Sequence, residues 1–102
     1  MKEHIEILLN DLKHMKYSDN TTHELKTSFR QYESVVKEFY KLFPNEGYRF
    51  INGLIDEESS HLHNLSTKAS KTRRFDSYKN LKSNMVGDLE DMLTIIDIKN
   101  NA

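Results

Sequence analysis

Residues 25–43, LKTSFRQYESVVKEFYKLF, decide the fold because their apolar side chains recur at the spacing of one helix face. The intervals alternate between four and three residues, the period of an amphipathic helix, at Leu25, Phe29, Tyr32, Val36, Phe39 and Phe43. Pro44 follows at once, and proline ends a helix because it lacks an amide hydrogen and restricts the residue before it. The stretch therefore predicts a helix over about residues 22–43.

Three further stretches repeat this alternation and predict helices over about residues 2–16, 46–67 and 73–97. The first stripe consists of Ile5, Leu8, Leu12 and Met15. The second consists of Tyr48, Ile51, Ile55, Glu58, Leu62 and Leu65. The third consists of Phe75, Tyr78, Lys82, Met85, Leu89, Met92 and Ile96. With one proline and three glycines to interrupt it, the chain is expected to be all-α, a single helical domain over residues 1–102.

The spacing also predicts how the helices pair. In an antiparallel hairpin, facing residues have position numbers with a constant sum, and the stripes of 46–67 and 73–97 then meet around a turn centred at Ser70. The stripes of 2–16 and 22–43 meet around a turn just after Ser18. Both centres are polar turns, so we expect an antiparallel four-helix bundle of two helical hairpins, with long, coiled-coil-like third and fourth helices. The alternative is a single elongated coiled coil that dimerises.

In this register Glu58 faces Lys82, which predicts an ion pair between the third and fourth helices. Glu58 and His61 also have the Glu-x-x-His spacing of di-iron bundles, but the second such pair and the further glutamates that those sites need are missing. No nucleophile motif or Gly-rich phosphate loop accompanies the scattered histidines and carboxylates. We therefore expect no enzyme activity, no cofactor and no metal.

Composition excludes several further classes. The absence of cysteine rules out disulfides, thiolate metal sites and cysteine catalysis. No apolar run is long enough to span a membrane and no signal-peptide core is visible, so a cytoplasmic protein is expected. The net charge of −1 offers no overall attraction to nucleic acid or an anionic membrane. Eleven lysines against four arginines, with nine asparagines, are typical of an AT-rich bacterial or phage gene.

The predicted helices differ in length, and this predicts an exposed apolar end. The first is about 15 residues long and the fourth about 24, a difference of roughly 13 Å at 1.5 Å per residue. One end would then have three helices, and we expect it to bind another protein or a second copy of the chain through Phe39, Phe43, Phe50, Met92, Ile95 and Ile98. Length and helix number are similar to those of bacteriocin immunity proteins and phage-encoded inhibitors. This likeness of architecture fits a non-catalytic regulator, inhibitor, immunity factor or accessory subunit.

The alternative function is nucleic-acid binding by the basic tip, residues 68–82. This segment carries six lysines and arginines against one aspartate. The side chains expected to contact phosphates, with Phe75 and Tyr78 nearby, are Lys68, Lys71, Arg73, Arg74 and Lys79. Phosphate binding weakens steeply with salt and apolar docking does not, so salt dependence separates the two functions.

Overall fold

The computed structural model describes residues 1–18, 21–66 and 68–101. They form the helices α1 (Lys2–His14), α2 (Thr21–Leu42), α3 (Pro44–Ser60) and α4 (Lys71–Asn100), with the short 3₁₀ helix η1 (Leu62–Leu65) before α4. No strand occurs in these three ranges, and the predicted all-α class is confirmed. Within the same ranges, no helix combines the length and the apolar character that a membrane span requires.

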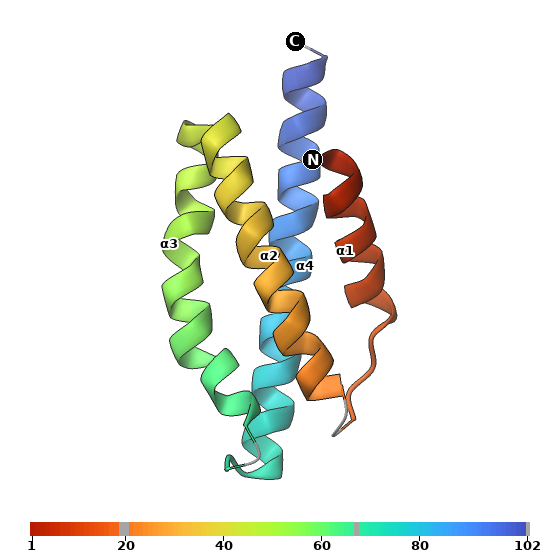
Figure 1. Ribbon diagram of the computed structural model, residues 1–102, viewed down its shortest axis with the longest axis vertical. Helices are drawn as coiled ribbons and strands as arrows, with labels where there is room; N and C mark the ends of the chain where they lie inside the picture. The colour runs from red at the N-terminus through yellow and green to blue at the C-terminus, as the bar shows by residue number, and fades with distance from the viewer. Residues whose placement is uncertain (19–20, 67, 102) are drawn as a thin grey trace.

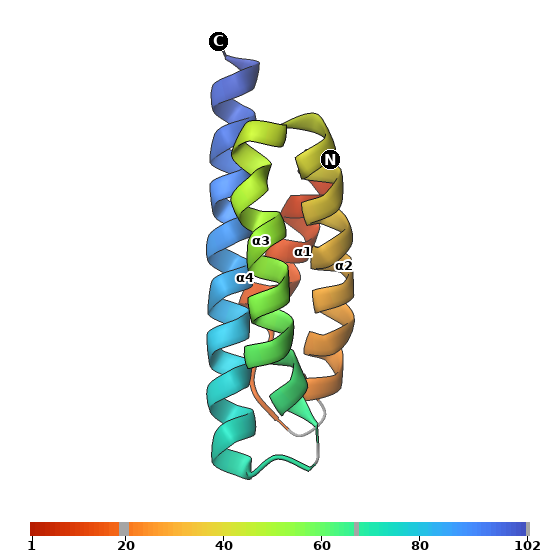
Figure 2. The same ribbon diagram turned by 90° about the vertical axis from the view of Figure 1, so that its left-hand side faces the viewer.

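The helices lie side by side along the longest axis of a molecule that measures 47 × 25 × 16 Å (Figures 1 and 2). Successive helices run in opposite directions, as the colour order of the chain in Figure 1 shows. In Figure 1, α1 and α3 lie on opposite sides of the molecule, and the last turns of α4 extend beyond the other helices at the C-terminal end. The described part of α4 therefore offers surface at this end that no other helix covers.

The predicted helix over 46–67 is divided at His61 into α3 and η1. Side chains bind backbone carbonyls at this point: the Ser59 hydroxyl donates to Ile55 O at 2.9 Å, and the Asn64 amide donates to Ser60 O at 2.8 Å. Such local bonds compete with the α-helical hydrogen-bond ladder. Further on, the Ser70 hydroxyl caps α4, which runs on both sides past the predicted 73–97.

The core is formed by the apolar faces of the four α-helices and η1. On α1, α2 and α4 the predicted stripes are buried over most of their length. The stripe residues whose predicted burial is confirmed are Ile5, Leu8, Leu12, Leu25, Phe29, Tyr32, Val36, Phe39, Tyr78, Met85, Leu89, Met92 and Ile96. Phe75, by contrast, is 44% exposed. The helical period therefore located the buried face of these three helices correctly, except near the start of α4.

On α3 the predicted stripe is wrong. Tyr48 is 59% exposed and Ile55 74% exposed, while the buried positions are one residue earlier, at Gly47, Phe50, Leu54 and Glu57. A shift of one residue turns the helix by about 100°. Gly47 explains the choice: its Cα lies so close to the Tyr40 backbone that a Cβ atom there would come within 2.8 Å of Tyr40 Cα. This approach brings the Phe50 ring edge-on to Phe39, with the ring centroids 5.6 Å apart.

The predicted ion pair between Glu58 and Lys82 is also wrong. Glu58 lies 3.6 Å from the Arg30 guanidinium of α2. The Lys82 ammonium instead donates to the carbonyl of Met15, just beyond the end of α1. The last carbonyls of a helix lack intrahelical partners and attract a cation, which explains why Lys82 faces α1 rather than α3.

At the three-helix end, three members of the predicted partner-binding set are not accessible to a partner. Phe39, Phe50 and Met92 are buried in the chain's own core, because the close approach of α3 to α2 fills the space that α1 leaves. Phe43 and Ile95 are partly buried against this core. Ile98, 63% exposed, is the member of the predicted partner-binding set that stands open to solvent.

Candidate functional site

The outer face of α3 carries the apolar residues whose spacing predicted that they would lie in the core. Tyr48 and Ile55 are exposed and Ile51 is partly buried. Their spacing of three and four residues places the three side chains on one line along the helix. Tyr40 and Leu42, at the end of α2, are exposed as well. Apolar surface that was predicted to close the fold is therefore offered to solvent.

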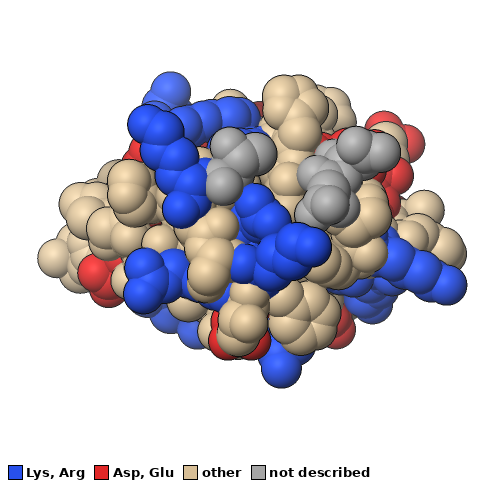
Figure 3. Space-filling model, turned by 90° about the horizontal axis from the view of Figure 1, so that it is seen from below, with Lys and Arg blue, Asp and Glu red and all other residues tan. Residues whose placement is uncertain are grey.

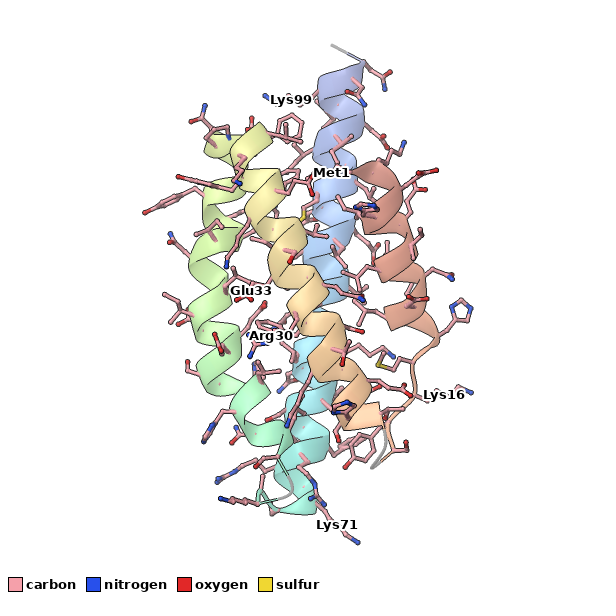
Figure 4. All side chains as sticks on the ribbon, viewed as in Figure 1. Met1, Lys16, Arg30, Glu33, Lys71 and Lys99 are labelled. Carbon is pink, nitrogen blue, oxygen red and sulfur yellow. The ribbon has the colours of Figure 1, made fainter. Side chains whose placement is uncertain are left out.

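A groove of about 890 Å³ continues this face between α2 and the α3–η1 segment. We call it the α2–α3 groove; it is lined by Lys26, Thr27, Arg30, Ile55, Glu58, Ser59, Leu62, His63 and Ser66. Arg30 is one of these lining residues and lies 3.6 Å from both Glu33 and Glu58; Figure 4 shows Arg30 and Glu33 together between α2 and α3. The groove thus combines two apolar side chains, Ile55 and Leu62, with charged side chains that are already paired across it.

A second groove, about 410 Å³ in volume, lies between the end of α1 and the first half of α4. We call it the α1–α4 groove; it is lined by Lys13, Tyr17, Phe75, Tyr78, Lys79, Lys82, Ser83 and Val86. Tyr17 packs edge-on against Phe75 and Tyr78, with centroid distances of 5.2 Å to each. Aromatic rings and lysines therefore share one concave surface, and no carboxylate is among the lining residues.

The basic tip continues from this groove. Lysine and arginine side chains are spread over this end of the molecule among uncharged residues, and acidic atoms are seen mainly at its margins (Figure 3). Lys68, Lys71, Arg73 and Lys79 are exposed and Arg74 is partly buried. The Ser70 hydroxyl accepts a hydrogen bond from the Arg73 amide at 3.2 Å and so caps the helix that carries four of the five cations.

A polar cluster inside the bundle joins three helices. The Tyr32 hydroxyl donates to Asp88 Oδ2 at 2.5 Å, and Glu57 lies nearby with its Oε2 buried and without a hydrogen-bond partner among the described residues. Burial raises the pKa of Glu57 to about 7, and the negative charges of Asp88 and Asp56 act in the same direction. Burial also raises the pKa of Asp88, against the hydrogen bond from Tyr32. Glu57 lines neither groove, so we interpret this cluster as part of the core.

Some parts of these surfaces were not visible in the sequence pattern. Tyr17 follows the end of α1, where helical period carries no information, and Lys13 was not singled out. Glu57 sits beside the stripe residue Glu58, and period alone favoured Glu58. Within residues 1–18, 21–66 and 68–101, no group of three or more histidine, aspartate or glutamate side chains is placed to hold a metal ion.

Comparison with known proteins returned no relationship. No protein-family model, curated protein or solved structure matched the chain.

Proposed function

We propose that this protein is a non-catalytic protein-binding module, a regulator, inhibitor, immunity factor or accessory subunit, that docks a partner on the outer face of α3. The observation that carries the proposal is the line of Tyr48, Ile51 and Ile55 beside the α2–α3 groove, of which Tyr48 and Ile55 are exposed. Large apolar side chains that are grouped on a small protein mark interaction surfaces, whereas single ones are ordinary. The proposed docking site therefore lies on the side of the bundle and not at the three-helix end that the sequence predicted.

The shape of the surface favours a helical partner segment. An apolar line on one helix beside an open groove is the arrangement that accepts an amphipathic helix, whose own apolar residues recur at three and four residues. Tyr48 and Ile55 would be the anchors, and the Arg30–Glu58 pair would face the rim. The scaffold in this proposal is an antiparallel bundle of two hairpins, acting in the cytoplasm without cofactor or catalysis; the cysteine-free sequence is compatible with that compartment.

Changing Ile55 to aspartate tests the proposal, with Ile7 to aspartate as the matched control. Both isoleucines are exposed, but Ile7 lies on α1, away from α3. Affinity capture from an extract of the source organism, quantified by mass spectrometry, should find a partner whose recovery falls about tenfold with Ile55→Asp. Recovery with Ile7→Asp should equal that of the unchanged chain. Far-ultraviolet circular dichroism should show the same helicity in all three proteins.

Two results of the capture experiment would contradict the proposal. If nothing is retained, or if Ile55→Asp retains the same proteins as Ile7→Asp, the outer face of α3 is not a docking surface. A second copy as the partner would appear in sedimentation equilibrium as a dimer that Ile55→Asp converts to a monomer. That result would support the docking site and would identify the partner as a second copy of this chain instead of another protein.

A further inference from the structure

We propose that the α1–α4 groove, together with the basic tip, binds single-stranded nucleic acid. The proposal is independent of the partner surface, because α1 and α3 lie on opposite sides of the molecule (Figure 1). It names a ligand class for a groove that the helical pattern did not locate. A base would stack on the exposed Phe75 ring, and phosphates would follow the cations of α4.

The stacking surface is the Phe75 ring, which two further rings support. Phe75 is 44% exposed, Tyr17 packs against it with the ring planes at 86°, and the buried Tyr78 ring packs against Tyr17 at 74°. A ring that is held by a perpendicular neighbour loses little freedom when a flat ligand is placed on its open side. Base–aromatic stacking tolerates any sequence, because every base has an aromatic face. The volume of about 410 Å³ is within the range of small-ligand sites and open enough for a strand to pass.

The charges favour an anionic ligand. Lys13, Lys79 and Lys82 line the groove without a carboxylate among the lining residues. Lys82 is already bound to the carbonyl of Met15, and Lys13 lies 3.8 Å from Glu90. Lys79 is exposed and makes no ion pair with any described residue, so its charge is available to a phosphate.

The basic tip extends this charge beyond the groove. Lys71 and Lys79 lie one turn before and one turn after Phe75 on α4, so that cations flank the exposed ring along the helix. A strand whose base lies on Phe75 would therefore meet a cation in each direction, which an isolated anion would not require.

Fluorescence anisotropy with a labelled oligothymidylate of twelve nucleotides tests the proposal at low salt. The unchanged chain should bind it, and Phe75→Ala should weaken binding at least fivefold, as expected for the loss of one stacked base. Tyr48→Ala, which removes an exposed ring from α3, should leave the affinity unchanged. Lys79→Gln should reduce the slope of log affinity against log salt by about 0.7, the value for one phosphate contact on a single strand. Lys41→Gln, an exposed lysine on α2, should not change that slope.

Further ligands separate stacking from simple charge attraction. A duplex of the same length and inorganic polyphosphate should each bind more weakly than the single strand, and Phe75→Ala should not affect polyphosphate. No binding at low salt, equal binding of polyphosphate, or an unchanged affinity with Phe75→Ala in a normally helical protein would each overturn the proposal. Thymidine monophosphate that binds as tightly as the oligonucleotide would also overturn it, in favour of a free nucleotide. None of these results depends on capture of a protein by α3.

Discussion

Replacing Gly47 with alanine should lower the free energy of unfolding by about 2 kcal/mol, the usual cost of forcing a methyl group into a packed contact. The new Cβ would lie 2.8 Å from Tyr40 Cα and 3.2 Å from a carbon of the Phe39 ring. A main-chain atom cannot rotate away as a side chain can, so α3 would have to move off α2. Urea denaturation followed by circular dichroism at 222 nm measures the loss.

Gly53 supplies the matched control for this prediction. It lies on the same helix, and a Cβ there would meet no heavy atom within 4 Å. Gly53→Ala should therefore raise the free energy of unfolding by about 0.5–1 kcal/mol, because alanine loses less backbone entropy on forming a helix. Equal effects of the two substitutions would show that α3 does not approach α2 at Gly47.

Stability should fall as the pH rises from about 4.5 to about 7.5, because the folded chain holds a proton on Glu57 that the unfolded chain releases. The pKa of Glu57 is raised from its ordinary 4.5 to about 7. A raised carboxyl pKa means that the native state binds the proton more tightly, so the penalty appears above pH 4.5 and is complete above pH 7. We expect a loss of about 2 kcal/mol, less than the full shift implies because water reaches part of the group.

Glu57→Gln isolates this effect, since glutamine has the shape of a protonated glutamate and no charge. At pH 7.5 it should raise the free energy of unfolding by about 2 kcal/mol, and near pH 4.5 it should have little effect. Glu58→Gln is the control: Glu58 is half-exposed beside Arg30, and its loss should cost about 0.5 kcal/mol or less. Urea titrations at a series of pH values measure both. An unchanged pH slope in Glu57→Gln would contradict the burial of this carboxyl beside Asp88.

The raised pKa of Glu57 shows that the polar cluster lowers the stability of the fold at neutral pH. The hydrogen bond between the Tyr32 hydroxyl and Asp88 joins α2 to α4, and Glu57 faces both from α3. Polar groups that pair across a core disfavour other helix registers, at the expense of stability. Sequence reasoning assigned this role to Glu58 and Lys82. In the structure the polar side chains that meet across the core are instead those of Tyr32 and Asp88, with Glu57 beside them.

Helical period was enough to predict the buried faces of α1, α2 and most of α4, because their buried apolar side chains recur at intervals of three and four residues. Ile5 and Leu12 on α1 and Phe29 on α2 are buried as their spacing required. The spacing of apolar side chains along a single helix is a local property, and a helix in water buries whichever face is apolar enough. The all-α class followed from the same property, together with the scarcity of proline and glycine.

On α3 two faces compete, and the sequence by itself could not rank them. One contains Tyr48, Ile51 and Ile55, and the other contains Gly47, Phe50 and Leu54. The first has more apolar residues, but Gly47 lets the second approach α2 closely enough to seat the Phe50 ring against Phe39. Close packing decides which of the two faces is buried. Close packing depends on the shape of the neighbouring helix α2, and the spacing of residues along α3 contains no information about that shape.

The sequence by itself thus determined that the chain is helical, which faces of α1, α2 and α4 are buried, and that residues 68–82 form a basic segment. Only the tertiary structure decided the exposed face of α3 and the partners of Glu58 and Lys82. It also brought Tyr17, from the segment after α1, against Phe75 of α4. The physical reason is the same in each case: helix formation and amphipathicity are local, whereas rotation of a helix and contact between distant segments follow from packing shapes and unsatisfied backbone groups.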